Sequence, residues 1–270
     1  MNGYIDFNSE ILSNPEDKKE FLSRANNIMK VLQAAKIKTV VSTTKFKASD
    51  DIENYLETRK KAYDILEENF RYKNYPKILL GSEVVFSQDI INIKDINRLC
   101  IADTKYIMMT LPEEAYSEDT FTGIQKLIIS KNVYPVIPCI EKYTDTYSIE
   151  QIKKLSSLGI LMQVSCQAIV NRTTRRLALD LLNRGIAQII GSEDNIIRES
   201  PRSAAEVVMD VLNKDITSNV SDVIKPSPQY ADAVRIMRYN LPIGKYKQIK
   251  NNAGMVISNA ALKDIMISDI

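Results

Sequence analysis

The chain has 270 residues, of which 44% are hydrophobic and 26% are charged, and its formal net charge is +2 at pH 7. These proportions are typical of a soluble globular protein with one large domain or two small ones, and the charge does not favour nucleic acid or a membrane surface as a partner. The chain contains no histidine. Its absence excludes Ser-His-Asp triads, Cys-His dyads and all metal sites built on imidazole.

Other features of the composition exclude further classes of protein. Glycine is scarce, at 8 residues, and neither a dinucleotide-binding nor a P-loop glycine motif is present. Cys100, Cys139 and Cys166 are widely spaced and form no CxxC pair, which fits a reducing compartment. No apolar run approaches the length of about 18 residues that spans a membrane, and the N-terminus lacks a signal-peptide pattern. We therefore expect a cytoplasmic protein without membrane insertion.

Short runs rich in β-branched residues recur along the chain and predict strands. Most are continuously apolar, which is typical of strands that are buried on both faces of a parallel sheet. The predicted strands are Tyr4–Phe7, Thr39–Ser42, Ile78–Ser82, Tyr106–Met109, Val133–Ile137, Leu161–Ser165 and Gln188–Gly191.

Amphipathic segments between these runs predict helices. They include Asp17–Ala35, Asp50–Phe70, Thr173–Arg184 with Gly185 as its terminating glycine, and Ser203–Asn213. Strands that alternate with helices form parallel sheets through right-handed crossovers. Repetition of this unit along the chain predicts an α/β barrel, whose functional residues lie where the strands end.

Polar residues and short motifs follow most of the predicted strands. Because the carboxyl ends of the strands of a barrel share one face, we expect these segments to lie close together. They are Asp6–Leu12, Ser42–Phe46, Gly81–Val84, Thr110–Pro112, Pro138–Tyr143 and Gly191–Asn195.

The order and spacing of these segments resemble the bacterial capsule-associated protein-tyrosine phosphatases of the CpsB/YwqE type. These belong to the polymerase and histidinol phosphatase (PHP) superfamily. The family's D-x-H-x-H-x-L motif stands here as Asp6, Asn8, Glu10 and Leu12, and its G-x-E-V motif includes Glu83. The segments that follow the other strands match its A-T-P-H, I-E-F-P, A-H-P-E-R-Y and A-S-D-A-H-N motifs in order. The resemblance implies a distorted (βα)7 barrel of the PHP/TIM-like type over residues 1–213, with a C-terminal extension, 214–270, that packs on or closes the barrel.

The same resemblance implies a site for two or three metal ions, but this chain lacks most of its ligands. The family's histidine positions hold Asn8, Glu10, Lys45, Cys139 and Asn195, and its carboxylate after the fourth strand is replaced by Thr110. Glu83 is unchanged, and Glu193 retains a carboxylate. We therefore expect a degenerate phosphatase, or pseudophosphatase, that binds no metal cofactor.

Three interpretations of this site remain open from the sequence. In the first, Lys45 pairs with Glu83 or Glu10, so that the former metal site becomes a buried ion-pair network. In the second, Asp6, Glu10, Glu83 and Glu193 form an oxygen-only site for Mn²⁺ or Mg²⁺, and phosphatase activity survives. In the third, Cys139 performs covalent chemistry, but no CxxxxxR phosphate loop follows it, and a half-buried cysteine that fills the space of an imidazole is the favoured explanation.

Basic residues suggest where an anionic partner would bind. Lys142, Arg172 and Arg175 follow strands on the predicted active-site face, and the resemblance implies a protein tyrosine kinase or a phosphotyrosine tail as partner, in capsule or exopolysaccharide synthesis. The segment 222–250 has a net charge of +4 from six basic and two acidic residues. It either docks an acidic partner or contains an ordinary helix packed on the barrel. An oligomer is compatible with the sequence.

Overall fold

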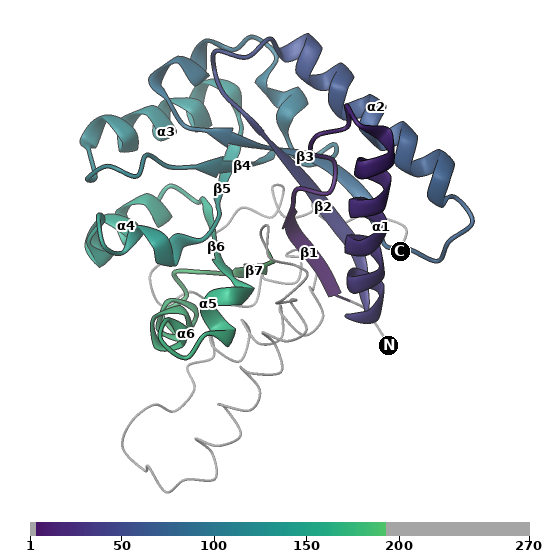
Figure 1. Ribbon diagram of the computed structural model, residues 1–270. Coiled ribbons are helices and arrows are strands. Elements are labelled where there is room, and N and C mark those ends of the chain that lie inside the picture. The colour runs from purple at the N-terminus through teal and green to yellow at the C-terminus, as the bar shows by residue number, and fades with distance from the viewer. Residues whose placement is uncertain (1–3, 193–270) are drawn as a thin grey trace, which may run out of the picture.

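The computed structural model of the protein describes residues 4–192. Figure 1 shows a curved sheet with helices arranged around its outer face. Every predicted strand overlaps an observed one, and neighbouring strands pair in parallel in chain order. The strands are β1 (Tyr4–Ser9), β2 (Ile37–Phe46), β3 (Lys77–Val85), β4 (Tyr106–Thr110), β5 (Tyr134–Ile137), β6 (Leu161–Ser165) and β7 (Ile189–Gly191).

Helices connect most of these strands. The predicted helices Asp17–Ala35, Asp50–Phe70 and Thr173–Arg184 are confirmed as α1, α2 and α6. The helices are α1 (Lys18–Ala34), α2 (Ile52–Phe70), α3 (Glu118–Lys131), α4 (Ile149–Ser156), α5 (Cys166–Val170) and α6 (Arg175–Asn183), and the single-turn 3₁₀ segments are η1 (Gln88–Asn92), η2 (Ile96–Leu99) and η3 (Ile140–Tyr143).

Local sequence signals set several of the helix ends. Asp17 precedes α1, and its carboxylate accepts hydrogen bonds from the backbone N–H groups of Lys19 and Glu20. Ser148 and Gln151 form a reciprocal capping box at the start of α4. Gly185 follows α6 with φ of 68°, as predicted for a terminating glycine.

The sheet buries apolar residues on both faces. Val40 belongs to one apolar cluster with Phe21 of α1 and Leu66 of α2, so its side of β2 faces the helices. Val41 belongs to a different cluster, to which nearly every strand contributes. Because successive residues of a strand point to opposite faces, the Val41 side is the interior of the barrel. The interior is therefore a packed core beneath the polar strand ends.

A hydrogen-bonded clasp joins the last strand to the first. The backbone N–H of Ser192, just after β7, donates to Asp6 Oδ1 of β1 at 2.9 Å, and the Ser192 hydroxyl donates to Asp6 Oδ2. Asp6 is fully buried. The clasp brings the two ends of the sheet together and gives the parallel barrel predicted from the sequence.

The crossover from β3 to β4 departs from the expected alternation of strands and α-helices. It contains the short segments η1 and η2 and no α-helix. Asp89, Asp95 and Asn97 lie in this stretch, and such side chains compete with the helical backbone for hydrogen bonds. The outer face of the sheet beside α2 is consequently covered only by short turns.

Some sequence predictions concern other parts of the chain. The helix Ser203–Asn213, the boundary between residues 213 and 214, and the basic segment 222–250 lie outside the described residues. Within residues 4–192, none of the helices has the length and apolar character that crossing a membrane requires.

Candidate functional site

Four of the predicted site residues lie near the ends of their strands, not in the loops that follow. Asn8, Lys45, Glu83 and Thr110 belong to β1, β2, β3 and β4. Lys45 stands directly opposite Glu83 in the parallel pairing of β2 with β3. Side chains in register on adjacent strands share a face of the sheet, so the barrel brings these positions together as expected.

At the end of β1, an amide replaces the first histidine position. Asn8 is 1% exposed, and its Oδ1 accepts a hydrogen bond from the hydroxyl of Thr43 in β2. Asn8 Nδ2 has no hydrogen-bond partner among the described residues. Thr43 was not predicted as a site residue, although it precedes Lys45 by two positions and so lies on the same face of β2.

The ion pair of Lys45 is exposed, which corrects the prediction of a buried network. Lys45 Nζ lies 3.5 Å from Glu10 Oε1, and the two side chains are 58% and 30% exposed. Position 45 is near the rim of the barrel, where the flexible lysine side chain extends into solvent. Water screens such a pair, which therefore stabilises the fold only weakly.

A hydroxyl lies against Glu83, the carboxylate of the G-x-E-V motif on which the resemblance rests. Glu83 is 8% exposed, and Thr110 Oγ1 donates to its Oε1 at 2.6 Å. Thr110 stands where the family carries a second carboxylate. The substitution therefore replaces a like charge beside Glu83 with a hydrogen-bond donor.

The segment after β5 is buried and tightly hydrogen-bonded. Cys139 adopts left-handed backbone angles, φ 49° and ψ 47°, and is only 3% exposed, so it is more buried than expected. Tyr143 OH accepts from the N–H of Leu111 at 3.0 Å. Burial raises the pKa of Tyr143 above its usual range, with smaller contributions from Cys139 and Glu83. A thiol with so little access to solvent is a poor nucleophile.

The Asp6 carboxyl group in β1 has a perturbed pKa. Desolvation by burial raises its pKa to about 6, although the two hydrogen bonds from Ser192 act in the opposite direction. The hydrogen bonds that close the barrel thus hold the Asp6 carboxyl group in place. Ser192 was not singled out from the sequence, because the contact joins residues 186 positions apart.

The predicted phosphate-binding residues differ in their availability. Arg172 and Lys142 are exposed. Arg175 is half-buried, and its guanidinium donates to the carbonyls of Ile169 and Val170 at the end of α5. Arg175 therefore caps the C-terminal end of α5 and is less available to a partner than predicted. The other predicted positions, Glu193 and Asn195, lie outside the described residues.

The family assignment follows from the sequence as a whole. Residues 4–225 match the profile of the family described as capsular polysaccharide synthesis, CpsB/CapC. The chain belongs to the CpsB/CapC family. No curated protein matches the sequence at a significant level.

One solved structure confirms the barrel fold of this CpsB/CapC protein. One match comes from the crystal structures of YwqE from Bacillus subtilis and CpsB from Streptococcus pneumoniae, which are metal-dependent tyrosine phosphatases. It has 16% sequence identity and a TM-score of 0.62, and covers 87% of this chain and 94% of that chain. Histidinol phosphate phosphatase (HISK) from Lactococcus lactis matches with 13% identity and a TM-score of 0.49, over 78% of this chain and 93% of that chain.

The described residues of this CpsB/CapC protein do not fit the metal ions that the resemblance implied. Within residues 4–192, no three His, Cys, Asp or Glu side chains gather as a metal site would require. Both oxygens of Asp6 accept from Ser192, Glu83 accepts from Thr110, and Glu10 faces a lysine. An ammonium group at a ligand position repels a dication and cannot ligate it while protonated.

Proposed function

We propose that this CpsB/CapC protein is a pseudophosphatase, a binding or regulatory protein of capsule or exopolysaccharide synthesis that acts in the cytoplasm. It would bind a protein tyrosine kinase, or the phosphotyrosine tail of one, without hydrolysing the phosphoester. The related YwqE and CpsB structures are of tyrosine phosphatases, which supports phosphotyrosine as the recognised group.

The replacement of the family's ligands by side chains that contact one another carries this proposal. Asn8 is bonded to Thr43, Glu10 to Lys45, and Glu83 to Thr110. Metal-assisted phosphoryl transfer needs several ligands on each ion to polarise the phosphate and generate hydroxide. Side chains that are engaged with one another serve a structural role at the same positions.

Elemental analysis of the purified full-length protein tests the loss of metal binding. We expect Mn, Fe and Zn well below one atom per chain, even after incubation with each ion and desalting. A stoichiometric ion would contradict the pseudophosphatase and favour the alternative, an active phosphatase with a carboxylate site for Mn²⁺ or Mg²⁺ formed by Asp6, Glu10, Glu83 and Glu193.

Peptide binding tests the proposed partner. A tyrosine-rich peptide should bind at least about tenfold more tightly when phosphorylated, since charge-assisted hydrogen bonds to a phosphate are among the stronger polar contacts. We expect Lys142→Gln and Arg172→Gln to weaken that binding, and Lys61→Gln, a charge change on the exposed side of α2, to leave it unchanged. Equal affinity for both forms of the peptide would overturn the proposed partner.

A further inference from the structure

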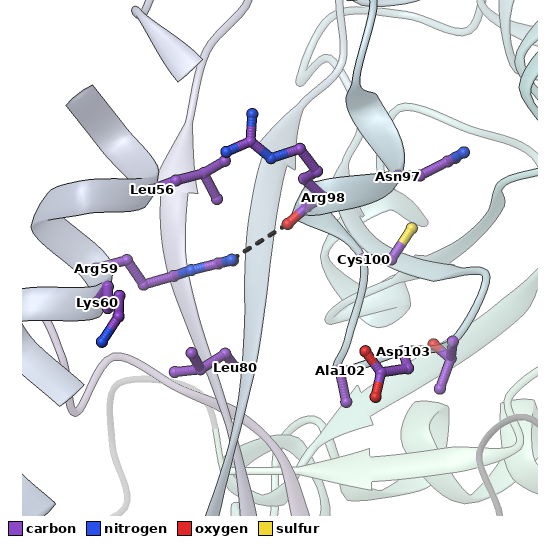
Figure 2. A pocket seen from close by; sticks show the side chains of 10 residues that line it. Leu56, Arg59, Lys60, Leu80, Asn97, Arg98, Cys100, Ala102 and Asp103 are labelled. Carbon is purple, nitrogen blue, oxygen red and sulfur yellow. Dashed lines mark hydrogen bonds between the residues drawn. The ribbon is translucent and has the colours of Figure 1, made fainter. Parts of the chain in front are cut away.

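A cavity of about 660 Å³ lies outside the barrel, between α2 and the crossover from β3 to β4. Figure 2 shows α2 on one side and the η2 segment with its following loop on the other. The cavity is separate from the strand-end site, since none of the residues discussed there lines it. Its walls are formed by Leu56, Arg59, Lys60, Leu80, Asn97, Arg98, Cys100, Ala102, Asp103 and Thr104.

The cavity results from the missing helix of this crossover. An α-helix would cover the sheet beside α2, but the chain passes through η1 and η2 and then turns back toward β3. The N–H of Ala102 donates to the carbonyl of Leu80 at 2.7 Å, which fixes the loop against the strand. The far wall is thus held in place by backbone bonds, and the opening is built into the fold.

Arg59 places a positive charge at the inner wall. Its Nη1 donates to the Gly81 carbonyl at 2.9 Å and to Ser82 Oγ at 2.8 Å, and its Nη2 donates to the Arg98 carbonyl at 3.2 Å. These acceptors are neutral, and within residues 4–192 no carboxylate forms an ion pair with Arg59. Burial lowers the pKa of Arg59, Tyr55 acts in the opposite direction, and the charge of Arg98 adds a smaller lowering. A half-buried cation without an anionic partner favours binding of an anion.

Arg98 brings a second guanidinium to the same space. Figure 2 shows its side chain reaching across the cavity toward α2, above Arg59. It is paired with Glu53, but both side chains are substantially exposed, at 45% and 67%. Lys60 adds a third cation at the rim, where it is 70% exposed and paired with Asp64 at 2.6 Å. Glu53 holds Arg98 through both Nη1 and Nη2, so an incoming anion has to compete with it, at an exposed position where water screens the pair.

The remaining walls limit the chemistry of the occupant. Leu56 and Leu80 offer apolar surface beside the cations. Burial raises the pKa of Cys100 to about 12, so its thiol is not a nucleophile. Asp103 is the one carboxylate on the wall, opposite three basic side chains. Such a lining favours an anion of high charge over a metal cation.

We propose that this cavity binds a small organic phosphate, with the phosphate between Arg59 and Arg98 and its organic body against Leu56 and Leu80. The planar guanidinium groups suit the oxygens of a phosphate monoester or diphosphate. The volume lies in the usual range of about 300–1,000 Å³ for small-molecule sites. The site is independent of the partner proposed for the strand ends.

Calorimetric titration of the full-length protein at low salt tests the site, with glucose 1-phosphate, phosphotyrosine, inorganic phosphate and glucose as probes. We expect at least one of the two phosphate esters to bind more tightly than inorganic phosphate, and glucose not to bind. The ester that binds more tightly shows whether the cavity prefers a sugar phosphate or an aromatic phosphate. Failure of both esters to bind, or equal binding of glucose and its phosphate, would overturn the proposal.

Variants of the Arg98–Glu53 ion pair give the decisive comparison. Arg98→Gln should weaken ester binding roughly ten- to a hundredfold, the usual effect of losing a charged hydrogen bond. Glu53→Gln should tighten it several-fold, because Arg98 loses its competitor. Lys61→Gln, with an exposed cation outside the cavity lining, should bind like wild type. All three side chains are exposed, so thermal unfolding should confirm intact folds. Equal affinity of the Arg98 and Lys61 variants would place the phosphate elsewhere.

Discussion

Lys45 and Glu10 illustrate how solvent exposure determines how much an ion pair stabilises the fold. The Nζ–Oε1 distance is 3.5 Å, and the lysine side chain is 58% exposed. At such a site, the Coulomb attraction is reduced by water and offset by the entropy of ordering two long side chains.

Lys45→Ala should therefore lower the free energy of unfolding by only about 0–1 kcal/mol. Urea denaturation at pH 7 measures this, with Lys61→Ala as a matched exposed control. The pair of Lys61 with Glu57 has side chains 69% and 65% exposed. A loss of more than about 3 kcal/mol at position 45 alone would restore the idea of a buried network.

Glu83 presents the opposite case, because it is buried. The Thr110 hydroxyl donates to it at 2.6 Å. Thr110→Val keeps the shape of the side chain but removes this donor, so we expect a loss of about 1–3 kcal/mol.

Thr110→Ser is the matched control for this change, since it retains the hydroxyl and loses only a methyl group. Thermal and urea unfolding of the two variants should place the serine closer to wild type. If the valine variant proves as stable as wild type, the hydroxyl does not support Glu83.

At the scale of elements, the clasp between β1 and β7 makes stability depend on pH. The Asp6 pKa is about 6 in the folded protein against an ordinary value of 3.8. Because the raised pKa means that the folded state binds the proton more tightly, the contribution of Asp6 to stability is greatest below pH 3.8. It falls as the pH rises toward 6, and then stays constant. The total change is about 3 kcal/mol, from about two pKa units.

Asp6→Asn should remove this dependence while keeping an acceptor for Ser192. Relative to wild type, its free energy of unfolding should rise by up to about 3 kcal/mol between pH 4 and pH 7. Denaturation curves at several pH values measure the difference. A difference that does not vary with pH would show that Asp6 titrates normally.

The strands were predictable because strands buried on both faces form continuous apolar runs. The ends of β1 to β4 were predicted too early, since polar residues such as Thr43 and Lys45 interrupt the apolar run while still belonging to β2. These polar residues face the barrel mouth, which a single sequence does not reveal. The lack of an α-helix between β3 and β4 was also missed, and with it the cavity beside α2.

The site was predictable as a set of positions but not as a set of contacts. A barrel places the strand ends side by side, so the proximity of Lys45 to Glu10 was foreseen. The burial of each side chain depends on how close it lies to the rim of the barrel. The Asp6–Ser192 clasp forms only when the barrel closes, since it joins residues 186 positions apart. Neither the burial of these side chains nor the clasp can be predicted from the local sequence pattern.

At the scale of the whole molecule, an intact barrel with lost ligands should accept those ligands again. We expect the combined variant Asn8→His, Glu10→His, Lys45→His, Cys139→His, Asn195→His and Thr110→Glu to bind some Mn²⁺ or Zn²⁺. We do not expect full activity to return, because a metal site also depends on the groups that orient each ligand, and the variant restores none of these. Elemental analysis of the folded variant measures this, and a folded variant without metal would contradict the placement of these residues.

The central claim is that this CpsB/CapC protein retains the barrel without the metal-dependent reaction. Phosphate release from phosphotyrosine, by the full-length protein with excess Mn²⁺ at pH 7, tests it most directly. We predict no release above that of a Glu83→Gln variant prepared in the same way. Sustained release by the wild type that Glu83→Gln abolishes would contradict the account and establish a working phosphatase.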